Sequence, residues 1–294
     1  MNVPSSLRAA ADRVLDWGPV ATGRRVMAVY DDAGGGLLAG GLTYSALFAL
    51  LPSLLLLTGV LGLAVDDPER RRAIVEGIGN SLPPLRGFLA ESLQQITDGA
   101  ASAGGIGLIG LAWGASRFYG SLDDAVGHIF RSAPKRGFVA RTLRGILSVV
   151  LLVSVFLGSL ILTGIASYLA EETAARLGTE SQAFWRVVTP LLTGIVFVGA
   201  AALVYRLVPA FHVPWSAVAL PAALVGIALA ALTQLFTYVA PRLIGAAAVY
   251  GTFVAIFAAM VWLATGFQLL LVGAAWVSVR LGSPAEREAL REES

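Results

Sequence analysis

Long apolar stretches alternate with shorter polar segments along the chain. A membrane-spanning helix needs about 20 mostly apolar residues, and six stretches meet this requirement. We predict spanning helices at about residues 37–65, 103–123, 145–169, 187–208, 215–240 and 248–280. The second stretch has the weakest pattern, because Arg117, Asp123 and Asp124 lie in it or beside it. The pattern therefore predicts an all-α integral membrane protein built as a six-helix bundle over residues 37–281.

Two polar segments carry a helical pattern of their own. Residues 1–36 are expected to be cytoplasmic, with apolar residues at helical spacing at Leu7, Ala11, Val14, Leu15 and Trp17. This spacing predicts an amphipathic helix on the inner membrane surface, ended by the glycines at 34–36, and a solvated leader is the alternative. Residues 66–102 are expected outside, as two short amphipathic helices separated by Pro83 and Pro84. Residues 282–294 form the expected cytoplasmic tail.

Composition supports a membrane protein and excludes several other classes. Hydrophobic residues make up 56% of the 294 residues and charged residues only 14%, against about 25% charged in a soluble domain. The chain has no cysteine, so disulfides and thiolate metal sites are excluded. The net charge of +2 comes without a clustered basic face, which a nucleic-acid partner would require. The first apolar stretch is too long for a signal peptide, so we expect it to stay in the membrane.

The basic residues predict the orientation of the helices. The segment between the second and third stretches contains five basic residues with no acid among them, which are Arg131, Lys135, Arg136, Arg141 and Arg144. Short basic loops are retained in the cytoplasm. Counting outward from this loop places both chain ends inside, with 13 basic residues on the inner side and seven on the outer side.

Three runs of residues resemble a known family when they are taken together. They are GGLTYSALFALLP at 40–52, VYRLVP followed by VPW within 204–226, and VYGT leading to a Gly-Ala pair within 249–274. In order and spacing they are similar to the YihY/BrkB family of bacterial inner-membrane proteins, once labelled ribonuclease BN. Thr43 and Ser45 depart from the usual residues of the first run. Ala275 stands where the family usually has an acidic residue.

This resemblance covers about residues 25–280 and implies a six-span protein of the bacterial inner membrane. It also implies an amphiphile of the cell envelope as a substrate, because transport of a lipid or similar molecule is among the roles proposed for the family. Membrane lipids are the expected partners. A homo-oligomer is a further option.

Charged residues in the second stretch are the first candidates for a functional site. Arg117 and Asp124 are seven residues apart, nearly two helical turns, and therefore share a face that His128 continues. A charge facing hydrocarbon costs about 3 kcal/mol or more. We therefore predict that Arg117 and Asp124 face the bundle interior, interact, and line a polar cavity near its cytoplasmic mouth. The alternative is an arginine that extends to the interface beside an ordinary carboxylate.

Polar residues in other stretches extend this set. Pro52 removes a backbone donor and is expected to kink the first span near the hydroxyls of Tyr44, Ser45 and Ser53, and the freed backbone groups can then line a cavity. The alternative for Pro52 is a static kink whose freed groups bond to Ser or Thr. For the polar residues of the last two spans, hydrogen bonds between helices are the alternative to lining the cavity and are favoured. The candidate cavity residues are Tyr44, Ser45, Pro52, Arg117, Asp123, Asp124, Arg206, Gln234, Tyr250 and Gln268.

Glycine pairs indicate where helices approach closely. Gly110 and Gly114, like Gly36 and Gly40, have the small-xxx-small spacing that permits close backbone contact. Packing inside the bundle is the favoured interpretation for both pairs, and an intermolecular dimer face is the alternative.

Catalytic chemistry receives no support from the residues. His128 and His212 lie on different loops, and no histidine or carboxylate group has metal-ligand spacing. We therefore expect no enzymatic activity, ribonuclease activity included, and no cofactor or metal. The preferred hypothesis is transport or handling of an amphiphilic envelope component through a polar cavity. A structural or accessory membrane subunit without transport activity is the alternative.

Overall fold

The computed structural model describes residues 18–64, 100–131, 179–209, 211–246 and 251–282, together with positions 69 and 173. The helices of this part are α2 (Gly18–Asp32), α3 (Gly35–Ala64), α6 (Ala100–Ile129), α8 (Thr179–Leu207), α9 (Trp215–Ala246) and α10 (Gly251–Arg280). The all-helical prediction is confirmed for these residues. The predicted span at 145–169, the surface helix around 7–17, most of the loop at 66–102, the tail beyond Gly282 and Tyr250 lie outside them.

Three of these helices contain a segment long and apolar enough to cross a membrane. The segments are Pro190–Leu207 in α8, Trp215–Val239 in α9 and Ile256–Arg280 in α10, within the last three predicted spans. Helices α3 and α6 are each 30 residues long and cover the first two predicted spans. Three candidate spans are thus found in the described part, and the total of six stays a prediction.

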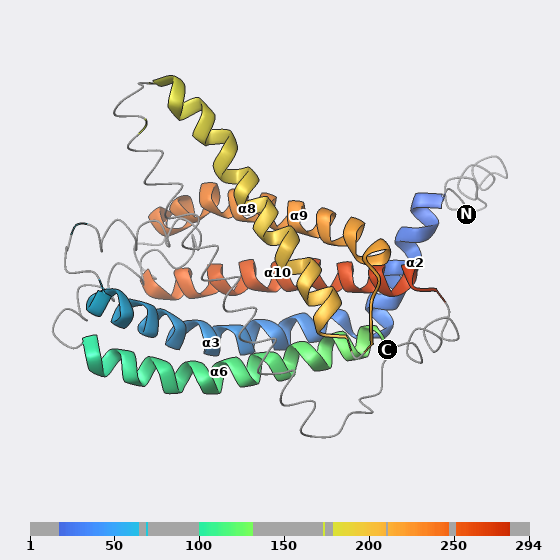
Figure 1. The fold of residues 1–294 in the computed structure, drawn as a ribbon, viewed down its shortest axis with the longest axis horizontal. Coiled ribbons are helices and arrows are strands. Elements are labelled where there is room, and N and C mark those ends of the chain that lie inside the picture. Colours follow the sequence, from blue (N-terminus) through green and yellow to red (C-terminus); the bar gives the residue numbers. More distant parts are fainter. Residues whose placement is uncertain are drawn as a thin grey trace.

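The helices pack side by side and gather most densely at one end of the bundle. Helices α3 and α6 run antiparallel in contact, α10 lies against α3, and α8 crosses obliquely with its first half directed away from α3 and α6 (Figure 1). At one end, α2, the start of α3, the end of α6, the turn between α8 and α9, and the end of α10 come together (Figure 1). We call this the packed end, defined by Tyr30, Phe130, Tyr205, Phe211 and Val277, which are all buried.

The packed end contains one apolar core shared by all six described helices. Tyr30 of α2, Leu42 of α3 and Leu122 of α6 belong to it, as do residues of the last three helices. The rings of Phe130 and Phe211 meet edge to face with centroids 5.8 Å apart, an arrangement that aromatic pairs prefer. This core ties the turn between α8 and α9 to the end of α6.

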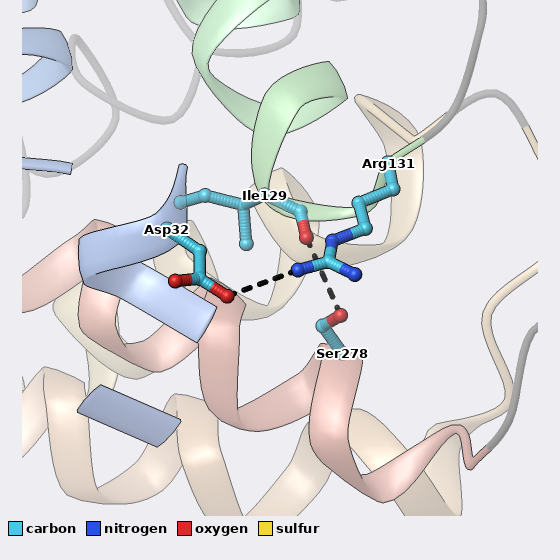
Figure 2. A network of polar contacts seen from close by, with 4 residues as sticks. All are labelled: Asp32, Ile129, Arg131 and Ser278. Carbon is cyan, nitrogen blue, oxygen red and sulfur yellow. Dashed lines mark hydrogen bonds and ion pairs between the residues drawn. The ribbon is translucent and has the colours of Figure 1, made fainter. Parts of the chain in front are cut away.

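Two polar contacts fasten α2, α6 and α10 together at this end. The guanidinium of Arg131 lies 3.2 Å from the carboxylate of Asp32, and the hydroxyl of Ser278 donates to the carbonyl of Ile129 at 3.4 Å (Figure 2). Arg131 has a φ of 50°, the left-handed conformation that often ends a helix. Gly34, with a φ of 69°, separates α2 from α3, because glycine adopts this conformation without a steric penalty.

Glycines permit very close helix contacts at two places. A Cβ on Gly114 of α6 would lie 2.6 Å from the carbonyl oxygen of Phe48 and 2.7 Å from the Cα of Ala49. A Cβ on Gly226 of α9 would lie 2.5 Å from the backbone nitrogen of Val198. Because these neighbours are backbone atoms, a side chain would force the helices apart. Gly114 therefore packs inside the bundle, as predicted.

The prediction for the other glycine pair was wrong. Gly36 and Gly40 are exposed, and a Cβ at either position would meet nothing within 4 Å. The same is true of Gly41. This part of α3 leaves an open, shallow face because the neighbouring helix α6 packs against the other side, where Leu42 and Ser45 are buried.

Candidate functional site

The predicted cavity residues are distributed over several places in the described part of the chain. Tyr44 and Arg117 are exposed on the α3–α6 pair, and Gln234 and Gln268 are exposed on α9 and α10. Arg206 lies in the last turn of α8. Pro52 lies within α3, which continues as a helix to Ala64. These residues are therefore not gathered around one interior point, and the cavity itself stays a prediction.

Ser45 joins two helices. Its hydroxyl donates to the carbonyl of Gly41 at 2.9 Å and lies 2.7 Å from the hydroxyl of Ser121 on α6. A hydroxyl has one proton to donate, so with that proton on Gly41 the Ser121 hydroxyl donates to Ser45. The geometry agrees with the alternative in which such polar residues bond between helices.

An exposed row of aromatic rings on α3 and α6 ends at Arg117. The rings of Tyr44 and Phe48 have centroids 4.8 Å apart, and those of Phe48 and Trp113 lie 6.1 Å apart. The Arg117 guanidinium carbon lies 5.8 Å from the Trp113 ring centroid, within the range of a cation–π contact. We call these four residues the aromatic–arginine strip. Its three rings are 63%, 41% and 57% exposed in the order given.

Helical spacing and one glycine build this strip. Tyr44 and Phe48 are four residues apart on α3, as are Trp113 and Arg117 on α6, and residues four apart share a helix face. The close approach of the backbones at Gly114 brings Phe48 beside Trp113. The two spacings are visible in the sequence, whereas the pairing of the two helices is not.

The prediction that Arg117 and Asp124 face the bundle interior was wrong. Both side chains are exposed rather than turned to the bundle interior, and Asp123 is only half-buried. The imidazole Nδ1 of His128 lies 2.7 Å from the backbone carbonyl of Asp124. Among the described residues no group of three or more histidines, aspartates or glutamates lies close enough to hold a metal ion.

Arg206 belongs to the packed end. Its guanidinium carbon lies 4.4 Å above the ring of Trp215, the first residue of α9. Its Nη1 atom is buried without a hydrogen-bond partner in the described part. The neighbouring Tyr205 is fully buried, and its hydroxyl donates to the carbonyl of Leu270 at 2.8 Å. Arg280 donates to the carbonyl of Ser216 at 2.8 Å. These contacts hold α8, α9 and α10 together.

A family model described as "Virulence factor BrkB" matches residues 26–293. The chain belongs to the virulence factor BrkB family. The resemblance found in its sequence is thereby confirmed, and the protein is a multi-pass membrane protein. No solved structure matches this chain.

Three bacterial relatives of this BrkB-family chain are named UPF0761 membrane proteins. The protein from Rhodospirillum rubrum is 26% identical over 242 residues, which cover 81% of this chain and 53% of the relative. The one from Chromohalobacter salexigens is 28% identical over 272 residues, 87% of this chain and 63% of the relative. The one from Glaesserella parasuis is 26% identical over 203 residues, 68% of this chain and 70% of the relative. The chain thus spans between half and two thirds of the length of the first two.

Because the chain belongs to a membrane-protein family, the position of Arg117 along the candidate spans matters. Its neighbour Phe118 contacts Phe267 of α10, with ring centroids 5.8 Å apart. Phe267 adjoins Gln268, the midpoint of the candidate span Ile256–Arg280. With a rise of about 1.5 Å per residue, Arg117 also lies about 18 Å along α6 from Ile129 at the packed end. Arg117 of this BrkB-family protein is therefore exposed at about the level of the midpoint of the α10 candidate span.

Proposed function

We propose that this BrkB-family protein binds and moves an amphiphilic lipid of the cell envelope across the bacterial inner membrane. The observation that carries this function is Arg117, exposed near mid-depth and resting on an aromatic ring. A charged side chain that faces hydrocarbon costs about 3 kcal/mol or more, so such residues mark ligand or ion paths. An amphiphile supplies polar atoms for the guanidinium and apolar chains for the rings. Catalysis forms no part of this function.

The proposed orientation has the packed end in the cytoplasm, with both chain ends on that side. It is supported by the basic residues of the packed end, because cytoplasmic ends of membrane helices are enriched in arginine and lysine. These residues are Arg24, Arg25, Arg131, Arg206 and Arg280.

Single cysteines test this orientation without background, because the native chain has none. His212 is exposed in the turn between α8 and α9, and Glu69 is exposed beyond the other end of α3, so both positions can carry an accessible cysteine. On intact cells with a permeabilised outer membrane, an impermeant thiol reagent should modify Glu69→Cys and not His212→Cys. After lysis both should react. Modification of His212→Cys alone in intact cells would reverse the orientation.

Native mass spectrometry of the purified protein tests lipid handling itself. A protein that handles one amphiphile should retain a lipid class well above its share of the membrane. Retention of lipids in the proportions of the surrounding membrane would contradict the function. The same spectra identify the alternative, an accessory subunit, by a protein partner in fixed ratio. The open face of Gly36, Gly40 and Gly41 is the observation that favours this alternative, since small residues let helices approach.

A further inference from the structure

The charge of Arg117 restricts what can cover the aromatic–arginine strip. Arg117 is exposed, its contact is with the Trp113 ring, and no ion pair joins it to another described residue. Its side chain presents five N–H donors and no acceptor. A ligand at this depth must therefore offer an anion or strong acceptor oxygens, because hydrocarbon offers neither.

A second copy of the chain is a poor occupant of this face. Two copies inserted in the same direction are related by an axis along the membrane normal, so equivalent residues lie at equal depth. The two Arg117 side chains would then meet in a medium that screens charge weakly, where like charges repel strongly. The exposed glycines of α3 permit another helix to approach closely, but repulsion between the two Arg117 side chains opposes a second copy of this chain.

An anionic lipid satisfies both the charge and the shape of the face. Phosphate oxygens accept paired, charge-assisted hydrogen bonds from a guanidinium. The rings of Tyr44, Phe48 and Trp113 offer apolar surface to the acyl chains. Gly36 and Gly40 precede Tyr44 and Phe48 at four-residue intervals, so α3 leaves an open track from the packed end to the rings.

We propose that the aromatic–arginine strip binds an anionic phospholipid whose phosphate reaches Arg117 near the middle of the membrane. The headgroup passes along the outer face of α3 and α6, over the glycine track, while the acyl chains stay in the bilayer. This assignment rests on the lipid-handling function proposed above and narrows its substrate to lipids with an anionic headgroup.

A lipid that carries a maleimide on its headgroup tests the depth of the phosphate directly. Maleimide-phosphatidylethanolamine keeps the phosphate as its only charge, and in a plain bilayer its headgroup stays at the surface. Ser116→Cys places a thiol beside Arg117 on the exposed face of α6. Ile227→Cys is the matched control, because Ile227 is 60% exposed and is the midpoint of the α9 candidate span. Both variants are reconstituted in phosphatidylcholine vesicles containing the probe.

The ratio of adduct at Ser116→Cys to adduct at Ile227→Cys is the measurement, with each thiol normalised to its reaction with N-ethylmaleimide. We expect a ratio of at least about ten, the factor that one charge-assisted hydrogen bond provides. A diacylglycerol carrying the same maleimide without phosphate should give a ratio near one. Arg117→Gln should lower the phospholipid ratio toward that value, and Arg117→Lys should retain part of it.

A ratio near one for the phospholipid, or an equal preference for the uncharged probe, would overturn the assignment. The comparison of the two cysteines on the native Arg117 background decides this even if Arg117→Gln does not fold. If the adduct ratio is near one but native mass spectrometry shows a defined bound lipid, the strip is not the binding site and the lipid-handling function still stands. Loss of both results would remove the function as well.

Discussion

The packed end and the aromatic–arginine strip treat polar groups in opposite ways. At the packed end, the Tyr205 hydroxyl and the Arg280 guanidinium bond to backbone carbonyls of neighbouring helices. On the strip, Tyr44 and Arg117 are exposed at the two ends of the aromatic row. The Tyr44 ring packs on Phe48, and the Arg117 guanidinium contacts Trp113. Polar groups that bond between helices specify how the bundle packs, whereas polar groups turned outward are available to a ligand. The two regions should therefore respond differently to substitution.

Removal of a tyrosine should separate the two regions most strongly. Tyr205→Ala empties a fully buried site and should lower the free energy of unfolding by about 3–5 kcal/mol. Tyr205→Phe loses only the bond to Leu270 and should cost about 1–2 kcal/mol. Tyr44→Ala, at a 63% exposed ring, should change stability by no more than about 0.5 kcal/mol. Unfolding in detergent, followed by denaturant or heat, checks all three. Equal losses at Tyr44 and Tyr205 would break the comparison.

Alanine at two glycines of the α3–α6 pair should act with opposite sign. Gly114→Ala forces a methyl group against backbone atoms of Phe48 and Ala49 and should cost about 1–3 kcal/mol. Gly40→Ala meets open space and should stabilise the helix by about 0.5–1 kcal/mol. Thermal unfolding of the two variants in the same detergent measures both effects. A loss at Gly40→Ala would show that another element packs on the open face.

The hydroxyl pair beneath the strip should contribute a small coupling. Ser45→Ala and Ser121→Ala each remove one side of the 2.7 Å contact. In a double-mutant cycle their coupling should be about 0.6 kcal/mol, the average for such bonds between membrane helices. Strictly additive effects would instead indicate that Ser45 is stabilised by its bond to Gly41 alone.

The ion pair of Asp32 and Arg131 should have the smallest effect. The side chains are 64% and 67% exposed, and exposed pairs contribute at most about 1 kcal/mol. Arg131→Gly loses the pair but relieves the left-handed conformation, which costs other residues about 1–2 kcal/mol. We expect Arg131→Gly to be neutral or slightly stabilising and Asp32→Ala to be slightly destabilising. The free energies of unfolding of both variants, measured at low and at high salt, check this. A large loss at Arg131→Gly would mean that its charge, rather than its backbone, is what the end of α6 requires.

Hydropathy predicted the positions of the helices better than their ends. Stretches at 187–208, 215–240 and 248–280 each contain a candidate span of the structure. However, α6 continues six residues beyond the predicted 123, and α8 begins eight residues before the predicted 187. Hydropathy detects the part of a helix that suits hydrocarbon, and polar turns such as Asp123 to His128 extend the same helix beyond it. Helix ends of this kind need caps and tertiary contacts to be located.

The orientation of helix faces was the main failure of sequence reasoning. Arg117 was expected to face inward because of its charge, and Gly36 and Gly40 because of their size, yet all three are exposed. A helix that is apolar on all sides has little periodic signal to distinguish a lipid-facing side from a protein-facing side. Phe48 and Trp113 were missed for the same reason, although their four-residue spacings to Tyr44 and Arg117 were present in the sequence.

The contacts of α10 have a consequence for the order in which the described helices can pack during synthesis. Helix α10 packs against α2, α3, α6 and α9, and it is the last helix that the ribosome makes in the described part. Until it emerges, Tyr205 lacks the carbonyl of Leu270, and α2 lacks the helix with which it makes most of its contacts. Before α10 is inserted, the earlier helices therefore expose the surfaces that α10 later covers. Partly folded states with such exposed surfaces misassemble more readily and are substrates for chaperones and proteases. Packing of α10 therefore completes the contacts of the helices described before it.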